Sequence, residues 1–279
     1  MSTVAIIGAG PLGGALACAL AARGRIREVR LIDPEGRVAE GKALDILQAS
    51  PVEPFNTRVT AATSPAAAAG ADAIVLADLV SGGEIAGEPG LALLRHLARM
   101  ETTAPFLFAG GLQRELMTRA LTELHLAAAR LVGSAPLALE SAVRAVTAAL
   151  MDASPADLSI GVAGVPPRDA VIGWEAATAF HRSIAEALAP HHLSALTARL
   201  PALWPPQPYT LASAAARVAE ALAEGSRRRY TCFAAIDGTG AGRNIIAAVP
   251  VEIVKGGVGK ALEPALSRYE RTAFENGLR

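Results

Sequence analysis

The chain is poor in cysteine, in aromatic residues and in net charge, and each shortage excludes a class of protein. Two cysteines in 279 residues, Cys18 in an expected buried helix and Cys232 in an expected strand, cannot form a disulfide framework or a metal site of familiar spacing. The 26 basic residues balance the 26 acidic ones, which gives no electrostatic reason to expect nucleic acid or an anionic membrane as partner. Charged residues interrupt the apolar runs before they reach membrane-spanning length, and the N-terminus shows no secretion signal. We therefore expect a cytoplasmic, globular protein that binds no metal.

Apolar segments of strand length alternate with segments of helical period through the first half of the chain. This order predicts a mostly parallel sheet with helices on both faces, a Rossmann-type doubly wound α/β fold. Ligands of such folds bind at the carboxyl ends of the strands. The expected strands are 3–7, 28–33, 57–62, 72–78 and 104–110, and the expected helices lie near 12–23, 36–48 and 89–100.

The pattern changes after residue 134, which predicts a domain boundary between 1–134 and 135–279. The second part reads as an α+β domain with mixed short elements. It is expected to hold helices near 136–152, 174–188 and 210–225, strands at 158–165 and 170–173, a hairpin formed by 230–237 and 244–259, and a final helix from about 258.

A glycine motif follows the first expected strand and opens the first expected helix. Gly8, Gly10 and Gly13 are spaced as G-x-G-x-x-G. The first glycine suits a tight turn, the second lets backbone approach a pyrophosphate, and the third lets helix and strand pack closely. The motif therefore predicts a dinucleotide-binding domain over 1–134. The competing interpretation is that the glycines only form a tight strand-to-helix turn.

An acidic residue follows the second strand where a ribose would lie. Asp33 stands 20 residues after Gly13, where a carboxylate can accept hydrogen bonds from a ribose diol and repel a 2′-phosphate. The cofactor expected is NAD rather than NADP, held by the three glycines with Pro11, Leu12 and Asp33. Pro11 suits the first helical position but removes one backbone donor from the loop, which predicts a weakened affinity.

Together with the glycine motif, the segments 31–46 and 244–262 resemble the lactate/malate dehydrogenase family. In that family, hydride passes between a nicotinamide and C2 of a 2-hydroxy acid, a histidine paired with an aspartate moves the hydroxyl proton, and arginines hold the substrate carboxylates. The resemblance implies NAD as cofactor, a small molecule or a protein as second ligand, and a homodimer or homotetramer.

The middle of the chain departs from the family pattern. Where the family carries its histidine, this sequence has Val165, and no histidine lies between His125 and His181. The segment 139–143 places Glu140 at the position of the paired aspartate and Val143 at that of a substrate arginine. Arg144 is adjacent to that position but is turned by about 100 degrees along a helix, so we expect it to point elsewhere.

Acidic residues replace basic ones in the segment that resembles the family's mobile loop. Residues 77–94 contain no basic side chain, and they carry Asp78, Glu84 and Glu88. The sign of charge over the site is thereby reversed, and Glu84 and Glu88 are expected to be solvated loop charges, or else to select a cationic or neutral ligand. Gly110 and Gly111 stand where the family has an asparagine, so its amide contact is expected to be lost.

Two residues remain as candidates for proton transfer. Glu140 is expected to be a relic carboxylate bonded to Arg144 or Arg168, and His181, predicted on a helix bordering the site, is the only histidine we consider as a substitute proton carrier. His191 and His192 are expected at a loop or helix start without a ligand role.

Three functions are consistent with these residues. The first is a non-catalytic homologue, a pseudoenzyme that acts by binding or assembly. The second is a NAD-dependent oxidoreductase acting on the CH–OH group of a neutral or cationic substrate. The third is a malate/lactate dehydrogenase with relocated catalytic residues. The absent histidine and arginines favour the first, and a ligand whose binding depends on the cofactor would favour the second.

Overall fold

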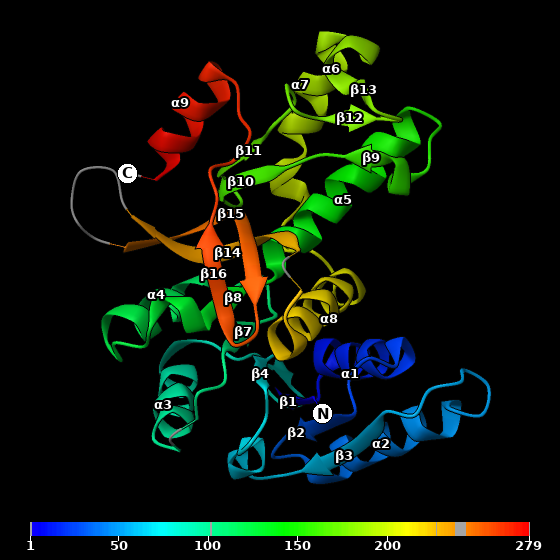
Figure 1. The fold of residues 1–279 in the computed structure, drawn as a ribbon, viewed down its shortest axis with the longest axis vertical. Coiled ribbons are helices and arrows are strands. Elements are labelled where there is room, and N and C mark those ends of the chain that lie inside the picture. The colour runs from blue at the N-terminus through cyan, green and yellow to red at the C-terminus, as the bar shows by residue number, and fades with distance from the viewer. Residues whose placement is uncertain (1, 101, 227, 238–243, 279) are drawn as a thin grey trace.

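The structure is a computed structural model that describes residues 2–100, 102–226, 228–237 and 244–278. Its first half alternates strands and helices, as the sequence predicts (Figure 1). The strands are β1 (Thr3–Ile7), β2 (Glu28–Ile32), β3 (Arg58–Ala62), β4 (Ala73–Leu76), β7 (Phe106–Phe108) and β8 (Leu131–Gly133). The helices are α1 (Pro11–Arg23), α2 (Gly36–Ala49), α3 (Gly87–Ala98) and α4 (Arg114–Thr122), and a two-stranded hairpin, β5 (Asp78–Leu79) and β6 (Gly83–Glu84), follows β4.

The second half begins with α5 (Ala135–Leu150) and ends with α9 (Arg268–Gly277). Its long helix is α8 (Pro208–Glu224), preceded by α6 (Ile184–Ala187) and α7 (Pro190–Ala198). Its strands are β9 (Leu158–Ser159), β10 (Val162–Val165), β11 (Asp169–Ile172), β12 (Thr178–Ala179), β13 (Arg182–Ser183), β14 (Arg229–Asp237), β15 (Asn244–Val254) and β16 (Gly257–Ala261).

One sheet runs through both halves of the chain. Its described strands have the order β11-β10-β15-β14-β8-β7-β4-β1-β2-β3, with β16 paired to β15. Pairing is parallel from β3 to β8 and antiparallel from β8 to β11. This arrangement confirms the predicted Rossmann-type sheet with a C-terminal α+β part.

Strand β1 lies between β2 and β4, so the chain leaves the middle of the parallel sheet in two directions. This is the switch point at which ligands of doubly wound folds bind. The loops that follow β1, β2 and β4 meet there, and they carry the glycine motif, Asp33 and Asp78.

Two hydrophobic cores divide the molecule differently from the predicted boundary. The larger core joins the parallel sheet to α8, β14 and β15, so residues far beyond position 134 complete it. The smaller core holds residues between Leu139 and Leu200. In Figure 1, α8 lies beside α1, and the Arg23 guanidinium on α1 pairs with the Glu220 carboxylate on α8.

Three local predictions are wrong. The segment expected as a helix near 174–188 forms the β12–β13 hairpin and only one short helix, α6. The final helix begins at Arg268, because Gly257–Ala261 form β16 instead. Cys18 is exposed on α1 rather than buried, while Cys232 lies in a strand, β14, as expected, and is buried there. Among the described residues, no helix is long and apolar enough to cross a membrane.

Candidate functional site

The glycine loop between β1 and α1 has the backbone geometry that the motif predicts. Gly8 has a positive φ of 107°, and its N–H donates to the Ile32 carbonyl at 2.7 Å. A Cβ at Gly13 would lie 2.0 Å from the Gly8 carbonyl oxygen, so only glycine lets α1 pack this closely. Pro11 occupies the first turn of α1, where its missing N–H costs no helical hydrogen bond.

The backbone donors of this loop already hold a carboxylate of the chain. Asp78 Oδ2 accepts the Leu12 N–H at 3.0 Å, and Asp78 Oδ1 accepts the Gly13 N–H at 2.8 Å. The Gly10 N–H donates to the Asp78 main-chain carbonyl at 2.8 Å. A Cβ at Gly10 would lie 2.5 Å from Asp78 Cγ. The close approach that the second glycine permits is therefore used by Asp78.

The sheet register explains why Asp78 reaches the loop. β1 and β4 are parallel neighbours, with Ile7 opposite Leu76. The two strands therefore end at the same edge of the sheet. Asp78, two residues after the end of β4, lies opposite the glycine loop that follows β1. The sequence prediction grouped Asp78 with the loop acids and missed this role, although an acid just after the β4 strand was the available signal.

Asp33 lies beside the same loop but is completely buried. Its Oδ2 accepts the N–H groups of Ala9 at 2.8 Å and Val80 at 3.1 Å, and its Oδ1 accepts that of Glu35 at 2.9 Å. The predicted neighbourhood of Asp33 and the glycine loop is thus present, with the carboxylate occupied by backbone donors. On the far side of the loop, Lys42 Nζ donates to the Ala9 and Gly10 carbonyls at 2.6 and 2.9 Å.

A third carboxylate accepts backbone N–H groups at the turn between β7 and α4. Glu84 accepts the Gly111 N–H at 3.0 Å and the Leu112 N–H at 2.8 Å. A Cβ at Gly110 would lie 2.2 Å from Glu84 Oε2, so the glycine makes room for this contact. The expectation that Glu84 is a solvated loop charge is wrong. Burial raises the pKa of Glu84, the two N–H donors oppose that shift, and the nearby Asp78 charge adds to it.

The side-chain amide of Gln113 fastens the β5–β6 hairpin to this turn. Gln113 Nε2 donates to the Ala77 and Ile85 carbonyls, and its Oε1 accepts the Gly110 N–H at 2.9 Å. Gln113 is completely buried. An amide side chain is therefore present near the position where the sequence lacks the family's asparagine, and here it holds the hairpin in place.

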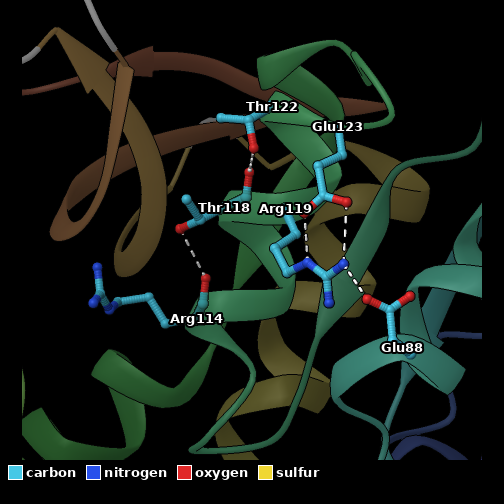
Figure 2. A network of polar contacts seen from close by, with 6 residues as sticks. All are labelled: Glu88, Arg114, Thr118, Arg119, Thr122 and Glu123. Carbon is cyan, nitrogen blue, oxygen red and sulfur yellow. Dashed lines mark hydrogen bonds and ion pairs between the residues drawn. The ribbon is translucent and has the colours of Figure 1, made fainter.

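Glu88 is also paired, although it lies on the surface. It starts α3, and its carboxylate binds Arg119 of α4 at 2.5 Å, while Arg119 also binds Glu123 at 2.6 Å (Figure 2). These two carboxylates raise the pKa of the Arg119 guanidinium. The Glu88–Arg119 pair joins α3 to α4, the Arg119–Glu123 pair lies at the end of α4, and exposed pairs of this kind contribute little stability each.

An apolar cavity of about 360 Å³ opens beside the hairpin at the carboxyl ends of β1 and β2. Ile7, Ile32, Leu79, Ile85 and Leu93 line it, and Glu84 is its one charged lining residue among those described. The cavity lies where a doubly wound fold binds ligands, and its lining favours an apolar or uncharged group.

The residues proposed for proton transfer do not form a catalytic pair. Val165 ends β10, and the turn to β11 continues with Pro166, Pro167 and Arg168. Glu140 Oε2 accepts the Thr231 hydroxyl at 2.5 Å rather than binding Arg144 or Arg168. Burial raises the pKa of Glu140, and the Thr231 hydrogen bond and the Arg144 charge oppose that shift.

Arg144 points away from the position of Val143, as expected. It donates to the Pro155 carbonyl at 2.9 Å, whereas Val143 is buried in the smaller core. His181 is exposed at the tip of the β12–β13 hairpin with a positive φ of 64°, so the helix predicted to carry it is absent.

The remaining predictions concern His191, His192 and metal binding. His191 and His192 lie in the first turn of α7, and their rings are in contact at a centroid distance of 4.0 Å, tilted by 53° to one another. Among the described residues, no group of three histidine, cysteine or acidic side chains is placed to hold a metal ion.

In comparison with known proteins, the first part of the chain is similar to one sequence family. Residues 2–84 match the family model described as lactate/malate dehydrogenase, NAD binding domain. A malate dehydrogenase of Ehrlichia chaffeensis is 41% identical over 73 residues, which are 26% of this chain and 23% of that protein. By sequence, the match therefore spans about a quarter of the curated relative.

Solved structures resemble the chain over almost its whole length. The minor L-lactate dehydrogenase of Enterococcus mundtii superimposes with a TM-score of 0.86 and 20% identity, covering 99% of this chain and 95% of that one. The malate dehydrogenase of Salinibacter ruber gives a TM-score of 0.87 with 21% identity, covering 99% and 93%. At these identities, the likeness establishes the fold.

The match to an NAD-binding domain agrees with the predicted cofactor class and can be tested against the residues present. The glycine loop and the start of α1 suit a dinucleotide, whereas the Asp33 carboxylate is buried and already accepts three backbone N–H groups. The diphosphate does not fit in the arrangement seen here, because Asp78 already uses the N–H groups of Leu12 and Gly13. The loop thus has the backbone shape of a dinucleotide-binding site, and the Asp78 carboxylate occupies the place of the diphosphate.

Proposed function

Because residues 2–84 match the NAD-binding domain model of the lactate/malate dehydrogenases and the chain has the fold of those enzymes, we propose that it is a non-catalytic homologue that acts by binding or assembly. NAD is the cofactor of that domain family. The proposal concerns what this chain does with the fold: it does not oxidise 2-hydroxy acids.

The observation that carries the proposal is the turn between β10 and β11. Val165 stands where the resemblance places the proton-carrying histidine, and its side chain cannot accept or release a proton. General acid–base assistance contributes about 10²–10⁴-fold in rate. Glu140, at the position of the paired aspartate, is bonded to Thr231.

The acidic β5–β6 hairpin supports the same proposal. An anionic 2-hydroxy acid would meet the Glu84 carboxylate, which occupies the N–H groups of Gly111 and Leu112. Val143 offers no guanidinium for the substrate carboxylate. Binding and proton transfer thus fail for separate reasons in one site.

Assembly is supported by apolar side chains on the outside of α2. Leu44 and Leu47, three residues apart on one face of this helix, are large hydrophobic residues that remain exposed. Such a group suits contact with another protein surface, and a second copy of this chain is the partner that the resemblance implies.

A NAD-dependent oxidoreductase with a neutral or cationic substrate is the second candidate function. Glu84 favours it, because this carboxylate lines the apolar cavity and would attract a cation or accept a hydrogen bond. A malate/lactate dehydrogenase with relocated catalytic residues is less well supported, because His181 lies exposed on the β12–β13 hairpin.

The protein is expected to show no dehydrogenase turnover with malate, lactate, oxaloacetate or pyruvate. NADH absorbance followed at high protein concentration measures this directly. A kcat above about 1 s⁻¹, the low end for ordinary enzymes, on any of the four acids would contradict the proposal.

The variant Val165→His tests whether one missing residue explains the inactivity. We expect little rescue, because the imidazole would face a substrate that is neither bound nor oriented. Recovery of ordinary turnover by this single substitution would show that the substrate-binding residues are intact. Val162→His, at a buried position on the same strand, serves as the control for a histidine placed elsewhere on β10.

A further inference from the structure

We propose that Asp78 is an internal competitor of the dinucleotide: its carboxylate occupies the backbone donors that a cofactor diphosphate needs, so the cofactor binds only when Asp78 leaves the glycine loop. This inference does not rest on the proposed lack of turnover, because an inactive chain can still bind a dinucleotide.

The competition is first one of geometry. A diphosphate on a glycine loop accepts hydrogen bonds from backbone N–H groups at the start of the following helix. Here the N–H groups of Leu12 and Gly13 donate to the two oxygens of Asp78 at 3.0 and 2.8 Å. The space above Gly10 is filled as well, since a Cβ there would lie 2.5 Å from Asp78 Cγ. No diphosphate oxygen can contact these donors while the carboxylate is present.

Charge adds to the geometric conflict. Asp78 and Glu84 face one another across the β5–β6 hairpin, and the Asp78 charge contributes to the raised pKa of Glu84. A diphosphate would bring further negative charge beside this pair. Lys42, the cation in contact with the loop, directs its ammonium at the Ala9 and Gly10 carbonyls.

The position of Asp78 is held from several sides, so its exclusion of the diphosphate is built into the fold. Its main-chain carbonyl accepts the Gly10 N–H. Gln113 holds the preceding Ala77 through its carbonyl, and Val80, two residues later, donates to Asp33. The carboxylate satisfies donors at the start of α1 that would otherwise need an external anion.

Titration of NADH into the wild-type protein, Asp78→Asn and Asp78→Ala tests the inference, with binding followed by NADH fluorescence. Asp78→Asn keeps the side-chain volume and one acceptor but removes the charge, and Asp78→Ala frees both donors. We expect NADH to bind Asp78→Ala about 100-fold more tightly than wild type, with Asp78→Asn in between, because two charge-assisted hydrogen bonds become available to the ligand.

Thermal unfolding with inorganic pyrophosphate gives a second readout that needs no nicotinamide. We expect pyrophosphate to raise the melting temperature of Asp78→Ala and to leave that of the wild type unchanged. Asp72→Ala is the matched control. Asp72 directly precedes β4, whereas Asp78 follows it, and the Asp72 carboxylate accepts the Thr3 N–H at 2.9 Å at the opposite end of the strands. This variant should lose stability without gaining affinity for either ligand.

Two results would overturn the inference. One is wild-type affinity for NADH equal to that of the variants. The other is a folded Asp78→Asn protein with no gain in NADH binding and no stabilisation by pyrophosphate. Turnover of malate or lactate by a variant that gains NADH affinity would refute the proposed function and leave this inference standing.

Discussion

At the scale of single residues, three carboxylates in this site accept main-chain N–H groups. Asp33 does so on the loop after β2, and Asp78 and Glu84 do so on the β5–β6 hairpin that follows β4. A carboxylate bonded to backbone donors satisfies groups that would cost free energy if left unpaired. In this site, carboxylates of the chain therefore occupy backbone N–H groups. A nucleotide-binding enzyme leaves such N–H groups free for an anionic ligand.

Glu140 is the residue whose state a pH experiment can report. Burial raises its pKa, so its ionised form is less favourable in the folded than in the unfolded chain. The resulting penalty is absent below its ordinary pKa of about 4.3, grows as pH rises from there towards the raised folded pKa, and is fully present above it. Glu140→Gln keeps an acceptor for the Thr231 hydroxyl and removes the buried charge.

We therefore expect Glu140→Gln to be more stable relative to wild type at pH 8 than at pH 5, as measured by urea unfolding at both values. Glu53→Gln, at an exposed turn position, is the control and should give the same difference at both pH values. A Glu140→Gln difference that does not change with pH would show that the carboxylate is not desolvated as described.

At the scale of elements, the contact between β1 and α1 depends on glycine at one position. A Cβ at Gly13 would meet the Gly8 carbonyl oxygen at 2.0 Å, and neither atom belongs to a flexible side chain. Gly41, within α2, is exposed, and a Cβ there would meet no atom within 4 Å. These two helical glycines differ only in what surrounds them.

Gly13→Ala is expected to destabilise the protein by ~1–3 kcal/mol, the usual cost of overpacking. Gly41→Ala should stabilise it by ~0.5–1 kcal/mol, because alanine loses less conformational entropy in a helix. Urea unfolding compares the two. Equal effects would mean that α1 shifts away from β1 without cost.

At the scale of the whole molecule, the larger core crosses the boundary predicted at residue 134. Leu211, Leu222 and Phe233 are buried in the same core as the parallel sheet. Removing the second half would expose the faces of α1 and β8 that contact α8 and β14. Large exposed apolar areas are poorly tolerated by isolated domains.

We expect a fragment of residues 1–134 not to fold alone, and the intact chain to unfold with the larger core as one cooperative unit. Circular dichroism and heteronuclear NMR of the fragment provide the measurement. A stable fragment with dispersed amide signals would establish 1–134 as an independent domain.

The sequence by itself determined the local parts of this protein. The alternation of strands and helices, the tight turn at Gly8, the helix start at Pro11 and the position of Asp33 after β2 all follow from residues close together in the chain. Such signals depend on backbone conformation and hydrophobic period, which neighbouring residues set. The prediction of a helix over 174–188 was wrong because the apolar spacing of this segment fits a helix as well as a hairpin.

Only the tertiary structure decided which groups occupy the site. Asp78 meets the glycine loop because parallel pairing sets Ile7 opposite Leu76, and Glu84 meets Gly111 because the hairpin folds over the β7–α4 turn. These contacts join residues 27 to 66 positions apart. Side-chain hydrogen bonds across such distances depend on register and packing, which no local pattern encodes. The sequence therefore predicted a place for an anion, and the fold supplied the anion from the chain itself.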